Sequence, residues 1–125
     1  MTIRNLEFVL RPRSIAVIGA SNNAGSVGHT LTKNVLAGGF AGPVYLVNPK
    51  HRRIAGQDCF LSIDELPQPP ELAVIATPPE TIPSLIAALG ERGTRAAIVI
   101  TSGLGPELRQ AMLNAARPTC LRIVG

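Results

Sequence analysis

Residues 14–28 read SIAVIGASNNAGSVG, and this segment indicates the architecture of the whole chain. It begins with a β-branched run at residues 14–18, which is typical of a strand buried on both faces. A glycine-rich turn follows, and a helical pattern starts at Ser26. Such a turn binds anions, because glycines let the backbone approach closely and the helix N-terminus offers unpaired N–H groups. The segment therefore predicts a phosphate-binding strand–turn–helix unit.

Four further apolar runs resemble the first one and predict strands at residues 44–47, 72–76, 96–100 and 121–124. Helical patterns lie between the strands at residues 26–37, 79–91 and 105–116, with short ones at 3–10 and 62–66. In the first helix we expect Val27, Leu31 and Val35 to form one buried stripe.

Alternating strands and helices favour parallel βαβ units. The predicted class is α/β, a Rossmann-like three-layer fold with a five-stranded parallel sheet. We expect one domain over residues 1–125 that is cut short at its C-terminal end.

Composition narrows the function classes. The chain has 125 residues, of which 46% are hydrophobic and 16% charged, with a net charge of +4. Its basic residues are dense only at residues 50–53, which argues against a nucleic-acid partner. A signal peptide and an apolar run of about 18 residues are both lacking, so we expect no membrane partner and a cytoplasmic location. Cys59 and Cys120 are expected to be small apolar residues of a reduced protein.

The spacing of the glycine-rich turn separates it from two common phosphate-binding motifs. GASNNAGSVG matches neither GxGxxG nor the GxxxxGK[ST] of P-loops. Its hydroxyl and amide side chains add donors to those of the backbone, and the alternative is a tight turn with a helix cap. The candidate phosphate-binding residues are Gly19, Ser21, Asn22, Asn23, Gly25 and Ser26.

The end of the second strand, VNPK at residues 47–50, suggests which nucleotide binds. NAD-binding folds usually carry Asp or Glu there for the ribose, whereas this chain has Asn48 followed by Lys50. A lysine attracts a ribose phosphate, which coenzyme A carries at the 3′ position and NADP at the 2′ position. Lys50 therefore favours a phosphorylated nucleotide over NAD, although it can also be an ordinary surface lysine.

Hydroxyl side chains follow the next two strands. Thr77 follows the third strand, and Thr101 and Ser102 follow the fourth. Ligands of open α/β sheets bind at the carboxyl ends of strands, so these residues are expected to face the same crevice. The alternative is that each hydroxyl caps its own helix. His29 and His51 have no carboxylate or nucleophile at a suggestive spacing, so we predict neither catalytic residues nor a metal site.

Five segments in order carry a resemblance to a known family: PRSIAVIGAS at residues 12–21, GSVG at 25–28, GFAGPVY at 39–45, VNPK at 47–50 and LAVIATPP at 72–79. The chain resembles the N-terminal CoA-binding domain of NDP-forming acyl-CoA synthetases. These include ADP-forming acetate–CoA ligases and are related to the succinyl-CoA synthetase α subunit. The same domain is also found fused to a GNAT module in bacterial protein lysine acetyltransferases.

The resemblance implies that the ligand is CoA or acyl-CoA and that the glycine-rich turn matches the family's phosphate loop. Lys50 would match a CoA-contacting lysine. The nucleotide and pantetheine side would be lined by Thr77, Pro78, Ile100, Thr101 and Ser102. The family's phosphorylated histidine lies in a later segment, and neither His29 nor His51 matches it.

Three functions remain open from the sequence. The first is CoA binding as part of an ADP-forming acetate–CoA ligase, with the remaining ligase domains or an ATP-grasp subunit as partners. The second is a regulatory CoA-binding domain of a GNAT acetyltransferase, and the third is an NADP-binding oxidoreductase domain. An exposed strand at residues 121–124 would also favour self-association into a homo-oligomer.

Overall fold

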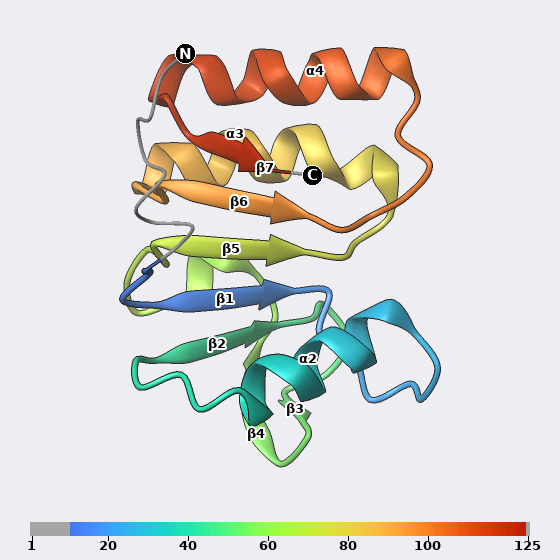
Figure 1. Ribbon diagram of the computed structural model, residues 1–125, viewed down its shortest axis with the longest axis vertical. Helices are drawn as coiled ribbons and strands as arrows, with labels where there is room; N and C mark the ends of the chain where they lie inside the picture. The colour runs from blue at the N-terminus through green and yellow to red at the C-terminus, as the bar shows by residue number, and fades with distance from the viewer. Residues whose placement is uncertain (1–10, 125) are drawn as a thin grey trace.

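Within residues 11–124, which this computed structural model describes, seven strands form one sheet. In chain order they are β1 (Ile15–Ile18), β2 (Val44–Val47), β3 (Arg53–Ile54), β4 (Gln57–Phe60), β5 (Leu72–Ile75), β6 (Ala96–Val99) and β7 (Arg122–Val124). Across the sheet their order is β3-β4-β2-β1-β5-β6-β7 (Figure 1).

Every strand pair except β3–β4 is parallel. If only the six parallel strands are counted in chain order, they run 3-2-1-4-5-6 across the sheet, which is the order of doubly wound nucleotide-binding folds. The strand order reverses between β1 and β5, which pair in register from Ile15–Leu72 to Ile18–Ile75. The predicted Rossmann-like class is confirmed, and the crevice at the carboxyl ends of β1 and β5 is where such folds bind ligands.

The predicted count of five strands is wrong, because the hairpin of β3 and β4 was not expected. Its two-residue turn places Ala55 at φ 54° and Gly56 at φ 75°, the left-handed pair that a tight hairpin needs. The strands themselves carry Arg53 and Asp58 rather than an apolar run. Without an Asn-Gly or Asp-Gly pair and without alternating apolar residues, the sequence had no usual hairpin signal.

Three helices connect the parallel strands: α2 (Val27–Ala37), α3 (Ile82–Arg92) and α4 (Pro106–Ala116). Single 3-10 turns add η1 (Ile63–Glu65), η2 (Pro79–Thr81) and η3 (Arg117–Thr119). The three main helices match the prediction, although the second begins as the 3-10 turn η2. The short helix expected at residues 62–66 is only the turn η1, and the one expected at residues 3–10 lies outside the described residues. No helix among residues 11–124 is long and apolar enough to cross a membrane.

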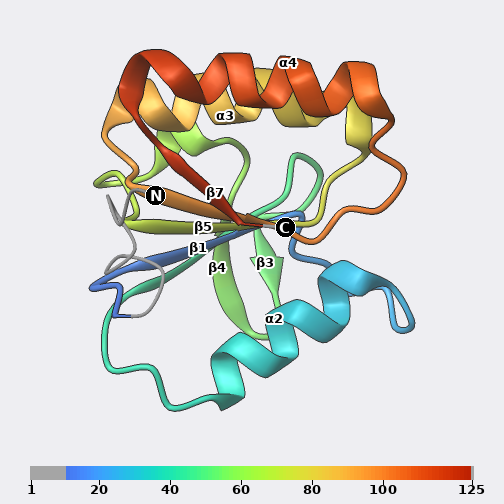
Figure 2. The ribbon, with the colours of Figure 1, turned by 45° about the horizontal axis from the view of Figure 1, so that its top comes forward.

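The helices are divided unequally between the two faces of the sheet. Helix α2 covers one face alone, whereas α3 and α4 lie together on the other (Figure 2). The larger core lies under α3 and α4 and includes Ile75, Ile86 and Leu89, all fully buried. A smaller core under α2 contains Val17 and Leu46.

Helix α2 extends past the sheet at its N-terminal end. Its first turn lies beyond the tips of the strand arrows in Figure 1. Leu31 and Val35 pack on the core as predicted, but Val27 is 58% exposed, so its assignment to the buried stripe is wrong. The overhanging turn instead contributes to the crevice at the carboxyl edge of the sheet.

Candidate functional site

The glycine-rich turn is formed by direct contact between backbones. Gly19 has φ 97°, and a Cβ at this position would lie 2.9 Å from the carbonyl group of Ala76, at the end of β5. Gly28 is buried in the first turn of α2, and a Cβ there would collide with the carbonyl oxygen of Gly19. The two glycines therefore let β5, the turn and α2 approach closely at the point where the strand order reverses.

Several backbone N–H groups of the turn point to no acceptor. The N–H groups of Gly25, Val27 and Gly28 have no hydrogen-bond partner among the described residues, as expected at the start of a helix. Around Gly25 the space is open, with no atom within 4 Å of the position that a Cβ would take. Together with the positive end of the helix dipole, these groups make the turn suited to an anion.

The polar side chains of the turn differ in what they can still offer a ligand. Ser26 caps α2 by accepting from the N–H of His29 at 3.1 Å, and its hydroxyl donates to the carbonyl of Asn23 at 2.8 Å. Its single hydrogen is therefore used. Ser21 accepts from the N–H of Asn23 at 2.9 Å and keeps its own hydrogen. The side-chain amide of Asn23 has no partner among the described residues, so Ser21 and Asn23 are the freer donors.

Asn22 ties the turn to the hairpin. Its amide nitrogen donates to the carbonyl of Arg53 at 3.2 Å, and its amide oxygen accepts from the N–H of Ala55 at 3.0 Å. One amide hydrogen remains for a ligand. The main role visible for Asn22 is to hold the β3–β4 hairpin against the turn, a role that the sequence did not suggest.

Asn48 holds the end of β2 against the same turn. Its amide nitrogen donates to the carbonyl of Ala20 at 2.8 Å, and its oxygen accepts from the N–H of Lys50 at 2.7 Å. The ammonium group of Lys50 makes no ion pair among the described residues, whereas Arg52 pairs with Glu65 and Arg53 with Asp58. Within the basic segment at residues 50–53, Lys50 thus keeps an uncommitted charge near the turn.

The threonines predicted at the strand ends lie beside the turn. A Cβ at Gly19 would be 3.3 Å from Cγ2 of Thr77, so these two residues are in contact. The hydroxyl of Thr101 donates to the carbonyl of Thr77 at 2.6 Å, which links the ends of β5 and β6. Pro78 and Ser102 are exposed next to them. The hydroxyl of Thr81, a residue outside the predicted set, is 2.7 Å from the hydroxyl of Thr77.

A cavity of about 300 Å³ adjoins the turn between α2 and the end of β6, with both apolar and polar side chains in its lining. Val27 and Ile100 are 58% and 42% exposed, an unusual exposure for large apolar side chains that flank a polar turn. Ile100 was predicted as a site residue and Val27 was not, because its spacing matched the buried stripe. The cavity is lined by Gly25, Ser26, Val27, Thr30, Leu31, Asn34 and Ile100.

A second cavity, of about 460 Å³, lies on the other side of the turn, between α2 and the hairpin. His29 and Lys33, one turn apart on α2, lie at its wall together with Ser21 and Ala55. The glycine-rich turn therefore lies between two hollows, one beside Ile100 and one beside the hairpin.

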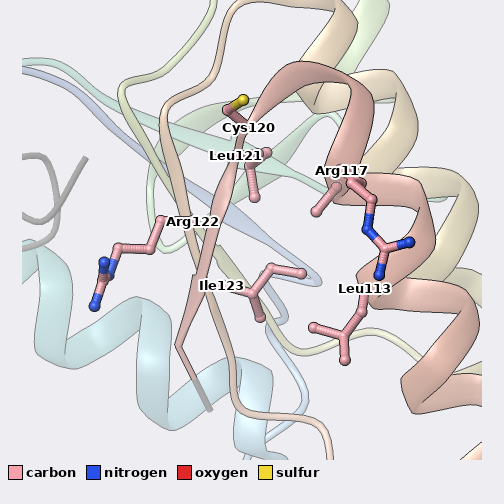
Figure 3. Close-up of a pocket in the computed structure, with 7 residues that line it drawn as sticks. Leu113, Arg117, Cys120, Leu121, Arg122 and Ile123 are labelled. Carbon is pink, nitrogen blue, oxygen red and sulfur yellow. The ribbon is translucent and has the colours of Figure 1, made fainter. Parts of the chain in front are cut away.

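A cavity of about 400 Å³ lies at the opposite end of the sheet, and none of the predicted site residues lines it (Figure 3). Leu113 of α4 and Arg117 of η3 lie on one side of it and Ile123 of β7 on the other, while Arg122 points to the opposite face of the sheet. It adjoins the amino end of β7, far from the carboxyl ends where the predicted residues gather.

Neither cysteine lies among the predicted site residues. Cys59 is buried in β4, and burial raises the pKa of its thiol, although a hydrogen bond from the backbone of Asn48 opposes this shift. Cys120 is exposed just before β7, and the two are not joined in a disulfide. Among residues 11–124, no group of His, Cys, Asp and Glu side chains is arranged to hold a metal ion.

Comparison with known proteins gives a consistent result. The family model described as a CoA binding domain matches residues 13–125. The chain is 33% identical to acetate–CoA ligase [ADP-forming] II of Archaeoglobus fulgidus, covering 99% of this chain and 19% of that protein. It is 32% identical to the α subunit of acetate–CoA ligase [ADP-forming] I of Pyrococcus furiosus, covering 97% of this chain and 28% of the subunit.

A solved structure shows the same arrangement. The dinucleotide-forming acetyl-coenzyme A synthetase 1 of Ca. Korarchaeum cryptofilum, in complex with phosphate and ADP, superimposes with a TM-score of 0.89 at 33% identity. The match covers 96% of this chain and 27% of that one. The chain thus spans between about a fifth and just over a quarter of the length of these relatives.

Proposed function

Because the chain belongs to the CoA binding domain family, we propose that it binds coenzyme A in the crevice at the carboxyl ends of β1, β5 and β6. The observation that carries this placement is the row of N–H groups at Gly25, Val27 and Gly28 that have no partner among the described residues. Backbone N–H groups at a helix N-terminus suit the diphosphate of a nucleotide.

In this proposal the phosphates of coenzyme A occupy two places. The diphosphate lies on the glycine-rich turn, where Ser21 and Asn23 add side-chain donors. The 3′-phosphate of the ribose meets Lys50, whose ammonium group has no acidic partner among the described residues. Asn48 supports this arrangement by fixing the backbone of Lys50 next to the turn.

The remaining candidate residues would line the path of the nucleotide and the pantetheine arm. The threonines and Pro78 border the crevice on the side of β5 and β6, and the cavity beside Ile100 offers apolar surface for the methyl groups of the arm. These candidates are Thr77, Pro78, Ile100, Thr101 and Ser102.

We further propose that the chain is the CoA-binding N-terminal part of an ADP-forming acyl-CoA ligase. The whole enzyme would interconvert acyl-CoA, phosphate and ADP with a carboxylic acid, CoA and ATP. This chain would supply binding, and the reacting groups would lie on the remaining domains or on an ATP-grasp subunit. A cytoplasmic location is part of the proposal, supported by two cysteines that form no disulfide. The acetyltransferase and oxidoreductase alternatives have no support among the relatives reported above.

Isothermal titration calorimetry with CoA, NADP and NAD tests the proposed ligand. We expect CoA to bind at least about tenfold more tightly than NADP, a difference of about 1.4 kcal/mol, and NAD to bind most weakly because it has no ribose phosphate. A far-ultraviolet circular dichroism spectrum on the same sample establishes that the chain is folded. Clear NADP binding by the folded chain without detectable CoA binding would contradict the proposal.

A further inference from the structure

Asn48, the residue directly after β2, is hydrogen-bonded to three separate parts of the chain. Its backbone N–H donates to the carbonyl of Phe60, at the end of β4, at 2.9 Å. Its side-chain amide nitrogen donates to the carbonyl of Ala20 in the glycine-rich turn at 2.8 Å, and its amide oxygen accepts from the N–H of Lys50 at 2.7 Å. One residue therefore connects β4, the turn and the lysine that has been proposed to meet a phosphate.

The two side-chain partners of Asn48 determine how its amide must lie. The carbonyl of Ala20 can only accept a hydrogen bond, and the N–H of Lys50 can only donate one. The side chain must therefore present a donor and an acceptor on the same short fork. Asparagine has both, whereas an ionised aspartate of the same shape has acceptors alone.

The bond to Ala20 is one half of a two-way connection between β2 and the turn. In the other half, the N–H groups of Gly19 and Ala20 donate to the carbonyl of Val47, at 3.0 and 3.2 Å. Ala20 is fully buried between these bonds. The start of the turn therefore cannot move relative to the end of β2 without breaking them.

On its other side, Asn48 holds the backbone of Lys50. A hydrogen bond from an Asn side-chain oxygen to the N–H two residues later is an Asx turn, and Pro49 between them restricts backbone rotation. The side chain of Lys50 is exposed and makes no ion pair among residues 11–124. The lysine thus has a fixed backbone and a free charge.

We propose that Asn48 is a positioning residue that fixes the spacing between the diphosphate position on the turn and the 3′-phosphate position at Lys50, and thereby sets the preference for a ligand with a phosphorylated ribose. This inference rests on the proposed function. Both phosphate groups of coenzyme A are attached to one ribose, which limits their separation. A protein that already holds its two anion positions at a matching distance loses less freedom on binding.

The test is the ratio of the dissociation constants for dephospho-CoA and CoA, measured by calorimetry. We expect Asn48→Ala to lower this ratio about fivefold, the size typical of one hydrogen bond, because Lys50 is no longer held at a fixed distance from the turn. Asn48→Asp is a second variant. It keeps the shape of the side chain and the bond from Lys50, loses the donor to Ala20 and adds a negative charge, so the ratio should fall at least as far.

The same replacement in a Lys50→Met background separates positioning from direct contact with the ligand. Methionine keeps an unbranched apolar side chain but has no charge. We expect a ratio near one for Lys50→Met alone, because neither ligand then meets a cation there. Adding Asn48→Ala should leave that ratio unchanged.

Asn114→Ala is the matched control. Asn114 is an exposed asparagine of α4 whose amide oxygen also accepts a hydrogen bond, from the side chain of Gln110 at 3.0 Å. Its ratio should equal that of the native chain. Partial unfolding of a variant does not imitate the effect, because it removes binding sites for both ligands alike, and circular dichroism measures the folded fraction.

Two results overturn the inference. If Asn48→Ala weakens both ligands by the same factor, Asn48 acts only on the part of the site that the ligands share. If the ratio falls further when Asn48→Ala is added to Lys50→Met, Asn48 contacts the 3′-phosphate itself. Absence of CoA binding by the native chain, or a native ratio of about one, instead refutes the proposed placement of coenzyme A, and this inference with it.

Discussion

Gly28 is the residue on which the geometry of the glycine-rich turn depends most directly. It is buried, and the space for its side chain is occupied by the carbonyl oxygen of Gly19. Backbone atoms yield less easily than the end of a flexible side chain, so any larger residue must push α2 away from β1. The N–H groups proposed to bind phosphate would move with the helix.

We therefore expect Gly28→Ser to destabilise the fold by about 1–3 kcal/mol, the usual range for overpacking. Urea unfolding measures the change. The control is Gly105→Ser at the N-cap of α4, where a Cβ meets no atom within 4 Å and serine is a favoured cap. Equal unfolding midpoints for the two variants would show that the contact between Gly28 and Gly19 is not tight.

In the proposed binding mode, Lys50 is the residue that distinguishes coenzyme A from dephospho-CoA, which lacks the 3′-phosphate. Lys50→Glu should weaken CoA binding about tenfold more than it weakens binding of dephospho-CoA, because only CoA carries the 3′-phosphate. Calorimetry with both ligands measures the difference. Arg117→Glu, an identical change of charge at the other end of the sheet, should affect both ligands equally and slightly. If Lys50→Glu lowered the affinity for the two ligands equally, the ribose phosphate would not lie at this lysine.

At the scale of elements, the hairpin of β3 and β4 supports the turn. Asn22 bonds to the backbone of Arg53 and of Ala55, on either side of Ile54. Ile54 is itself fully buried in the core under α2. The position of the hairpin and the conformation of the turn are therefore coupled through one side chain, and a ligand on the turn is expected to protect the hairpin.

Replacing this side chain tests the coupling. Asn22→Ala removes both hydrogen bonds, and we expect the amide hydrogen of Ala55 to exchange with solvent about fivefold faster, since the one bond that this N–H donates contributes about 1 kcal/mol. Hydrogen exchange followed by NMR measures this rate. Asn114→Ala, at an exposed asparagine of α4, is the control. An unchanged exchange rate at Ala55 would mean that the hairpin holds its place without Asn22.

At the scale of the whole molecule, the sequence was most informative where its pattern reflects burial. Strands covered on both faces read as apolar runs, and all five predicted runs are strands. The hairpin was missed because its strands are short and charged. The exposure of Val27 was missed because its spacing on the helix is that of a core residue. The spacing of apolar residues does not tell where a helix begins or ends relative to the sheet.

In the candidate site too, some features could be predicted from the sequence and others could not. Residue type and place along the chain were enough to select the turn, Lys50 and the threonines. The direction of each hydrogen bond was not predictable, because it depends on which acceptors the fold brings near. Ser26 and Asn22 were selected as ligand donors, yet the fold uses Ser26 as a helix cap and Asn22 largely as a tie to the hairpin.

The two edges of the sheet differ in how they are closed. The hairpin adds β3 outside the parallel strands at one edge, whereas β7 is the outermost strand at the other. No helix of the described residues covers the α2 side of β6 and β7 (Figure 2). Val124 on β7 is 38% exposed. Self-association through this edge stays a prediction.

The most direct test of the central claim, that coenzyme A lies on the glycine-rich turn, is an NMR titration of the nitrogen-15-labelled chain with CoA. The account predicts the largest amide shifts at residues 21–28, with further shifts at Lys50, Thr77 and Thr101. It predicts negligible shifts at residues 113–123, around the cavity of Figure 3. The largest shifts at residues 113–123, with unchanged signals from the turn, would contradict it.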